Sequence, residues 1–196
     1  MNTGNSSILI ISDSHGNAPA LTAALVWARQ VQLAQDMDFS AAFFLGDGGD
    51  DLAPASAQAG FSVPWYKVRG NVDLNFLIPD TLVLELPLHE ENSGNASRKL
   101  FLTHGNRYCL DRGGQTIAAT ARNAGAEAAL FGHTHVPHFS LVNGIFLLNP
   151  GSIGRSRSDA GPTFAVMECP FSDPITARFF CLVNKGRKIE VKELEL

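Results

Sequence analysis

Short apolar runs, each followed at once by glycine or polar residues, recur along the chain as far as Pro150. The first run, Ile8-Leu9-Ile10-Ile11, is continuous and rich in β-branched residues, which predicts a strand buried on both faces. Similar runs predict further strands at 41–45, 65–69, 82–86, 100–102, 128–131 and 145–148. A sheet built from such strands must be covered on both sides.

Segments with helical periodicity lie between these strands. Apolar residues repeat at i, i+3, i+4 and i+7 from Leu21 to Ala28, which predicts a helix that covers the sheet. Asn17 is a favourable N-cap for this helix, and Pro19 falls in its first turn. A short helix is expected at 51–58, and an Ala-rich helix at 115–123 that ends before Gly125. The alternation of strands and helices is typical of an α/β fold.

The last third of the chain has a different pattern. Residues 163–168, 176–183 and 188–194 alternate more between apolar and polar positions, which predicts antiparallel strands that close a second sheet. There is no internal repeat, linker or low-complexity stretch in the sequence. We therefore expect a flexible leader at 1–7 and a single domain at 8–196.

Composition narrows the class of protein. Hydrophobic residues make up 45% and charged residues 17% of the 196 residues, as in a compact globular chain. The formal net charge of −4 argues against stable binding of nucleic acid. The three cysteines are scattered without a CxxC pair, and the chain has neither a signal-peptide pattern nor a membrane-length apolar run. A cytoplasmic protein without membrane association is expected.

Polar side chains of the kinds that bind metals or phosphate follow six of the predicted strands. In open α/β sheets, ligands bind at the carboxyl ends of the strands. Each side chain also has a purely structural interpretation, such as helix capping, an Asx turn or a polar core position. Coincidence is a poor explanation for the whole set, which comprises Asp13-Ser14-His15, Gly46-Asp47, Gly70-Asn71, Thr103-His104-Gly105, Gly132-His133-Thr134-His135 and Asn149-Pro150-Gly151-Ser152.

The His-x-His pair has a specific geometric meaning. Residues i and i+2 of extended backbone point to the same side, so His133 and His135 are a candidate half of a metal site. Taken alone, the pair is more typical of surface or capping histidines.

In its order and spacing, this set of motifs resembles the calcineurin-like metallophosphoesterase superfamily, and in particular its small prokaryotic phosphodiesterases. The resemblance runs from Ile8 to Arg155. It implies a four-layer α/β/β/α sandwich of two mixed β-sheets flanked by helices, with the site along one edge of the sheets. It also implies two divalent metal ions. Asp13, His15 and His135 would hold one ion, Asn71, His104 and His133 the other, and Asp47 would bridge both.

The residue types suit this chemistry. A bridging carboxylate offsets the repulsion between two cations about 3.5–4 Å apart. Imidazole and carboxylate ligands without thiolate fit manganese, the favoured metal here, and also iron, zinc or nickel. The resemblance implies hydrolysis of a phosphoester by a hydroxide activated between the two metals, with Asp47, Asn71 and His104 in catalytic roles.

One position departs from the superfamily pattern. Many members carry histidine after the Gly-Asn pair, where it can protonate the leaving oxygen, but this chain has Val72. Asp73 and His138 are weak candidates for the missing acid. Asn17 and Arg155 are candidate substrate-binding residues, whereas helix capping alone also explains Asn17.

The predicted function is a metal-dependent phosphodiesterase acting on a small phosphodiester or nucleotide. Two alternatives use the same scaffold. One is a phosphomonoesterase or dinucleoside-polyphosphate hydrolase, which Val72 disfavours. The other is a non-catalytic platform like the scaffold subunit of the retromer trafficking complex, which the complete ligand set disfavours. A homo-oligomer is compatible with the sequence, but no segment indicates an interface.

Overall fold

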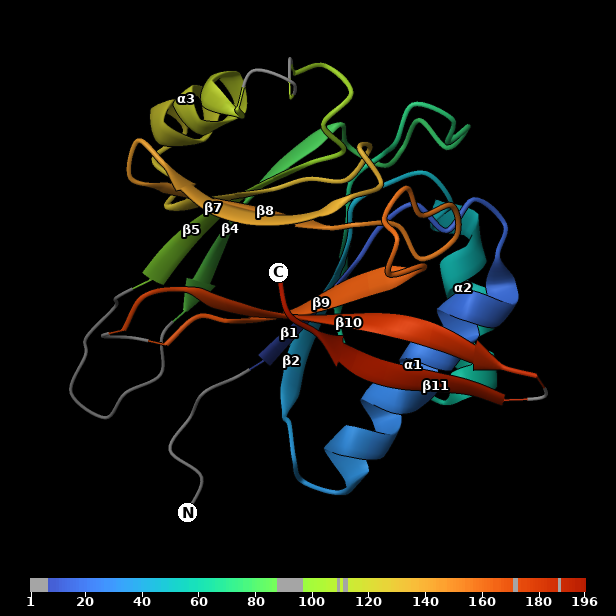
Figure 1. The fold of residues 1–196 in the computed structure, drawn as a ribbon. Coiled ribbons are helices and arrows are strands. Elements are labelled where there is room, and N and C mark those ends of the chain that lie inside the picture. Colours follow the sequence, from blue (N-terminus) through green and yellow to red (C-terminus); the bar gives the residue numbers. More distant parts are fainter. Residues whose placement is uncertain (1–6, 88–96, 109, 111–112, 171–172, 187) are drawn as a thin grey trace.

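Two mixed β-sheets pack face to face between helices (Figure 1). The computed structural model describes residues 7–87, 97–108, 110, 113–170, 173–186 and 188–196. The six-stranded sheet has the order β11-β10-β9-β1-β2-β3, and the five-stranded sheet has the order β4-β5-β6-β8-β7. The strands are β1 (Ser7–Ile11), β2 (Phe39–Phe44), β3 (Trp65–Lys67), β4 (Thr81–Pro87), β5 (Ser97–Thr103), β6 (Ala128–Leu130), β7 (Pro137–Val142), β8 (Ile145–Pro150), β9 (Thr163–Glu168), β10 (Thr176–Lys185) and β11 (Lys188–Leu194).

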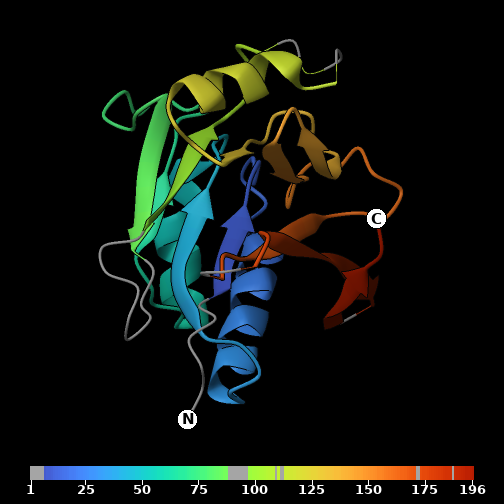
Figure 2. The same ribbon diagram turned by 90° about the vertical axis from the view of Figure 1, so that its left-hand side faces the viewer.

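The helices form the two outer layers. They are α1 (Ala18–Leu33), the 3₁₀ turn η1 (Gly49–Asp51), α2 (Leu52–Ala59) and α3 (Gln115–Asn123). Helices α1 and α2 pack on the outer face of the six-stranded sheet, and α3 covers the outer face of the five-stranded sheet (Figures 1 and 2). The predicted four-layer α/β/β/α sandwich is confirmed. No helix in the described part of the chain is long and apolar enough to cross a bilayer.

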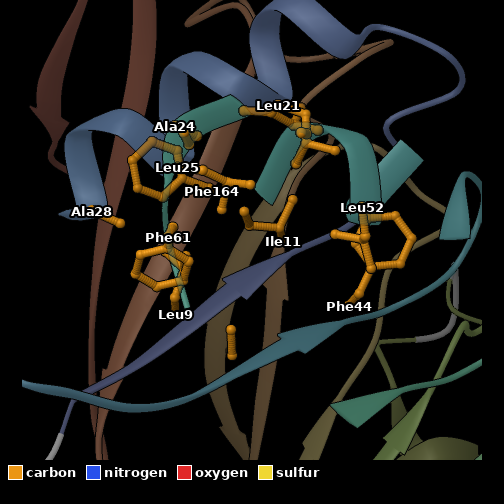
Figure 3. Packing of buried hydrophobic residues seen from close by; sticks show 14 of the residues in the cluster. Leu9, Ile11, Leu21, Ala24, Leu25, Ala28, Phe44, Leu52, Phe61 and Phe164 are labelled. Atoms are coloured by element: carbon orange, nitrogen blue, oxygen red, sulfur yellow. The ribbon is translucent and has the colours of Figure 1, made fainter. Parts of the chain in front are cut away.

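Three hydrophobic clusters explain why the central strands are apolar at nearly every position. Leu9 and Ile11 of β1 point towards α1 and α2 (Figure 3). Ile8 and Ile10 point the other way, into the layer between the two sheets. Because successive side chains alternate between the two faces of a strand, a strand covered on both sides buries all of them, as predicted for this run.

The local signals predicted for the first helix hold. Asn17 caps α1 by accepting a hydrogen bond from the N–H of Ala20 at 3.3 Å. Leu21, Leu25 and Ala28 are buried on its inner face (Figure 3). The helix therefore begins directly after β1 and its polar segment, and it fixes where that segment lies relative to the sheet.

The prediction for the C-terminal strands was wrong in one respect. β9, β10 and β11 do not close a second sheet but extend the sheet that contains β1, because β9 pairs with β1 in antiparallel register, Leu9 opposite Val166. Alternation of apolar and polar residues identifies a half-buried antiparallel strand without naming its partner.

Two further segments differ from prediction. β7 was not predicted, because His138 and Ser140 interrupt its apolar pattern; it forms a hairpin with β8. Ser7, placed in the leader by the sequence, belongs to β1, and its N–H donates to the carbonyl of Asp38 at 2.8 Å. Residues 1–6 of the predicted leader lie outside the described residues.

Parallel pairing brings the polar segments to one edge. β1, β2 and β3 are parallel to one another in the first sheet, as are β5, β6 and β8 in the second. The carboxyl ends of parallel strands lie at the same edge of a sheet, which is where ligands bind in α/β folds. The six polar motifs of the sequence follow these six strands.

Candidate metal centre

Hydrogen bonds that involve the backbone join the polar segments to one another. The N–H of Asp13, which follows β1, donates to the carbonyl of Gly46, which follows β2 in the same sheet, at 2.9 Å. The N–H of His133, from the second sheet's set, donates to Asp13 Oδ2 at 3.1 Å. The ring Nδ1 of His104, from the second sheet's segments, lies 2.7 Å from the carbonyl of Leu45, which directly follows β2. The two sheets therefore contribute to one centre.

The first group of ligand-type atoms consists of Asp13, His15 and His135, whose atoms all lie within 4.8 Å of one another. His135 Nε2 is 3.1 Å from Asp13 Oδ1, and His15 Nε2 is 3.7 Å from the same oxygen. The two imidazole Nε2 atoms are 3.3 Å apart. These are the three residues that the resemblance assigns to one metal ion.

The second group shares Asp13 and adds Asp47 and His104. His104 Nε2 lies 3.3 Å from Asp47 Oδ2 and 4.0 Å from Asp13 Oδ1. Asp47 Oδ2 is also 3.7 Å from His15 Nε2 in the first group. Asp13 is therefore the residue common to both groups, and Asp47, a member of the second, also comes close to a ligand-type atom of the first.

Asn71 and His133, the other two expected ligands, belong to neither of these two groups but lie next to them. The ring of His133 packs 5.2 Å from the ring of His104, centroid to centroid. Both Asn71 and His133 line a hollow of about 290 Å³, which we call the metal pocket. Its other lining residues are His15, Asp47, Val72, His135, Arg155 and Arg157.

Two buried polar atoms in the centre lack hydrogen-bond partners. Asp13 Oδ1 and His104 Nε2 are fully buried and make no hydrogen bond. An unsatisfied buried polar atom costs about 1–3 kcal/mol, so it calls for a partner. Both atoms face the other ligand-type groups, and the donor set of carboxylates and imidazoles fits divalent cations.

The backbone at the centre is held in an uncommon conformation. Of the seven non-glycine residues with positive φ in the described segments, five belong to the expected ligand set: Asp13, His15, Asp47, His133 and His135, with φ between 45° and 67°. Such residues cost roughly 1–3 kcal/mol each and persist where the surrounding structure demands them. The concentration of strain here marks a functional site.

The rings of two histidines are oriented by carbonyl groups. His135 Nδ1 lies 2.6 Å from the carbonyl of Arg155, and His104 Nδ1 is held by Leu45. An imidazole that donates its Nδ1–H to a carbonyl keeps Nε2 free as a ligand atom, which is a usual arrangement around bound metals.

Asp47 and His104 shift each other's titration. Burial by itself raises the pKa of Asp47. The His104 ring and the Val72 N–H lower it by more, so the net shift of the pKa is downward. Burial lowers the pKa of His104, and the Asp47 and Asp13 carboxylates more than reverse this. The buried carboxylates and the ring thus favour a positive charge between them, which is what a bound cation would supply.

Asp73, a weak candidate for the general acid in the sequence, has a structural role instead. Its carboxylate accepts four backbone N–H groups, from Asp47 at 2.9 Å, Gly48 at 2.8 Å, Gly49 at 3.2 Å and Gly70 at 2.8 Å. Both oxygens are occupied, so Asp73 is not a general acid but the anchor of the segment that carries Asp47. The Gly-Asp-Gly-Gly run was the available signal, because three of the four donors lie in it.

The structure also gives the positions of the candidate acid His138 and of the candidate substrate-binding residues Asn17 and Arg155. His138 Nε2 is bound to Ser140 Oγ at 2.8 Å, and His138 is not part of the metal pocket's lining. Asn17 uses Oδ1 to cap α1 and Nδ2 to reach the carbonyl of Gly154 at 3.4 Å, so its structural role is the one observed. Arg155 and Arg157 both line the metal pocket.

Gly154 allows two of the segments to meet. A Cβ at this position would overlap the carbonyl oxygen of Ser14, and the Gly154 N–H donates to the carbonyl of Asp13 at 3.0 Å. We expect Gly154→Ala to lower the free energy of unfolding by about 3 kcal/mol, because the new methyl group would clash with backbone atoms of Ser14, which cannot move aside as the end of a flexible side chain can. Urea unfolding measures this.

The matched control is Gly49→Ala, whose Cβ would meet only the end of the Ile78 side chain at 3.3 Å. An equal loss of stability in both variants would show that the close approach at Gly154 is not what matters.

Comparison with known proteins agrees with this geometry. The family model of the calcineurin-like phosphoesterase superfamily domain matches residues 7–170. The chain belongs to this superfamily. Among its superfamily relatives, the "Probable metallophosphoesterase YsnB" of Bacillus subtilis is 26% identical over 184 residues, covering 94% of this chain and 95% of that protein. The "Phosphodiesterase YfcE" of Escherichia coli is 26% identical over 172 residues, covering 82% and 86%.

Solved structures share the superfamily fold. A predicted phosphoesterase from Streptococcus pneumoniae aligns with a TM-score of 0.67 at 25% identity, over 98% of this chain and 100% of that one. Vps29 from Entamoeba histolytica, solved in complex with zinc, aligns with a TM-score of 0.67 at 22% identity, over 95% and 98%. The fold alone therefore does not distinguish an enzyme from a sorting protein. Membership of the superfamily and the phosphoesterase relatives identify the protein as a hydrolase of phosphoesters.

Proposed function

We propose that this metallophosphoesterase is a phosphodiesterase that uses two divalent metal ions. The observation that carries the proposal is the pair of overlapping ligand groups, which share Asp13, with Asp47 Oδ2 of the second group 3.7 Å from His15 Nε2 of the first. Asp13, His15 and His135 would hold one ion; Asn71, His104 and His133 would hold the other; Asp47 would contact both. Manganese is the metal we favour, with iron, zinc or nickel also suited to these ligands.

The chain's residues would divide the work of hydrolysis. When bound, the two cations supply an activated water and stabilise charge on the phosphoryl oxygens. Asp47 would fix the spacing of the two cations, while His104 and Asn71 position the second of them. Arg155 and Arg157, which line the metal pocket, would balance the negative charge of the phosphoryl group. The substrate would be a small phosphodiester or nucleotide.

The first experiment measures turnover of bis-p-nitrophenyl phosphate and p-nitrophenyl phosphate with and without added Mn²⁺, and after treatment with EDTA. Metal-dependent hydrolysis of the diester is the expected result. Preference for the monoester would instead support a phosphomonoesterase. An absence of turnover with every metal, together with a stable protein complex, would support a platform role of the Vps29 kind.

Val72 gives a second test, because it occupies the position where many superfamily members have an acid-donating histidine. Its side chain is 54% exposed and lines the metal pocket, so a larger ring has room there. Val72→His is expected to raise monoester hydrolysis about tenfold relative to diester hydrolysis, by protonating the poorer leaving group. The ratio of the two kcat/KM values measures this.

Val72→Gln, which is close to histidine in size but cannot act as a general acid, is the control. An unchanged ratio in Val72→His would contradict our account of the missing acid.

A further inference from the structure

A second hollow of about 430 Å³ opens directly beside the metal pocket. We call it the outer hollow. His15, Val72 and Arg155 line both spaces, so the two are continuous across these three side chains. A phosphoryl group held at the metal pocket has a substituent that must leave it in some direction. The outer hollow is an adjoining space of a size that accepts an aromatic ring or a nucleoside.

Its wall on one side is apolar and uncovered. Leu74 lines the outer hollow with 83% of its surface exposed, next to Val72 at 54%. These two residues begin a segment, 72–77, that also exposes Phe76 and Leu77. A run of large exposed apolar side chains on a monomer indicates a binding surface. Because Val72 also borders the metal pocket, the apolar wall starts where the phosphoester would lie.

The lining also contains three acidic residues, Asp50, Asp51 and Asp73, and the Asp73 carboxylate is taken up by four backbone N–H groups. Asp51 is engaged in the structure, since its Oδ2 accepts from Ser14 Oγ at 2.6 Å and from the Gly16 N–H at 2.8 Å. Asp50 is exposed and lines the hollow as well. Arg155 lies where the outer hollow meets the metal pocket, so the carboxylates of the remaining lining disfavour an anionic group, such as a second phosphate, in the outer hollow. The space therefore suits an uncharged group with apolar surface.

We propose that the outer hollow holds one of the two alcohol groups of a phosphodiester, and that Val72 and Leu74 select an uncharged aryl or nucleoside-like group there. The proposal rests on the proposed phosphodiesterase function and adds its substrate class. A monoester, which has a single alcohol group, gains less from such a wall than a diester, in which either group can lie against it.

Binding of two diesters of equal charge tests this without any need for turnover. Diphenyl phosphate and dimethyl phosphate carry the same monoanionic phosphate, and only the first has rings for the outer hollow. We expect the Mn²⁺-loaded protein to bind diphenyl phosphate at least tenfold more tightly in calorimetric titration. Leu74→Ser should weaken binding of diphenyl phosphate about fivefold and leave dimethyl phosphate unchanged.

Leu141→Ser is the matched control, because Leu141 is 61% exposed on β7 and lines neither hollow. Equal affinities for the two esters in the wild type, or binding of neither, would overturn the proposal. Equal weakening of both esters by Leu74→Ser would also overturn it, because the loop would then act only by supporting the metal pocket.

A second copy of the chain is the other occupant that an apolar loop can have. Sedimentation of the wild type and of Leu74→Ser distinguishes the two: a dimer that the substitution converts to a monomer, with unchanged affinity for diphenyl phosphate, would replace the proposal. Hydrolysis of bis-p-nitrophenyl phosphate by the wild type is scored separately, so failure of the phosphodiesterase function and failure of the outer hollow give different results.

Discussion

Asp47→Asn is expected to lower diester turnover about a thousandfold and to remove most of the bound metal, while the fold survives. The variant changes little else. Asp47 Oδ1 accepts the Val72 N–H at 3.0 Å, and the amide oxygen of asparagine can keep that bond. What is lost is the negative charge on Oδ2, which lies 3.3 Å from His104 Nε2 and 3.7 Å from His15 Nε2.

Metal content by mass spectrometry and turnover of bis-p-nitrophenyl phosphate measure the two effects, and circular dichroism checks the fold. Asp36→Asn, an exposed carboxylate in the turn after α1, is the control for loss of one charge. Turnover at the wild-type level in Asp47→Asn would refute the bridging role.

Asp73→Asn has the second largest expected effect. The carboxylate of Asp73 accepts four backbone N–H groups, so replacing one oxygen with an NH₂ group sets donor against donor. We expect a loss of about 2–4 kcal/mol in the free energy of unfolding. Because Asp47 is carried by the same segment, diester turnover should also fall, by about tenfold to a hundredfold, through displacement of a metal ligand.

Urea unfolding and metal titration separate the two consequences. A variant that is less stable but binds metal and turns over diester normally would show that Asp73 supports only the fold. If Asp73 acted as a general acid, turnover would fall without a loss of stability, and diesters with good leaving groups would be affected least.

Much of the fold is determined locally. Continuous apolar runs such as 8–11 predicted strands covered on both faces, and Asn17 with Pro19 marked where α1 begins, because these signals depend on neighbouring residues alone. The order of the strand-end motifs was enough to predict the superfamily and the set of residues that meet at one edge. Local composition and spacing also predicted the helices at 51–58 and 115–123 within a few residues.

Tertiary structure decided what depends on partners distant in the chain. Alternation showed that β9, β10 and β11 are half-buried, but only pairing of β9 with β1 assigns them to the six-stranded sheet. The sharing of Asp13 between both ligand groups depends on the meeting of four segments, which the spacing of residues along the chain does not encode.

Asp73 and Arg157 show for single side chains, too, what the sequence determines and what the tertiary structure decides. The sequence gives an acidic and a basic residue in polar loops, and both have several ordinary roles there. Asp73 became an anchor because N–H groups from two segments converge on it, and Arg157 reached the metal pocket because its N–H is held by the His135 carbonyl at 3.0 Å. Residue types and their order specified the chemistry of the site, while hydrogen bonds between distant loops specified its geometry.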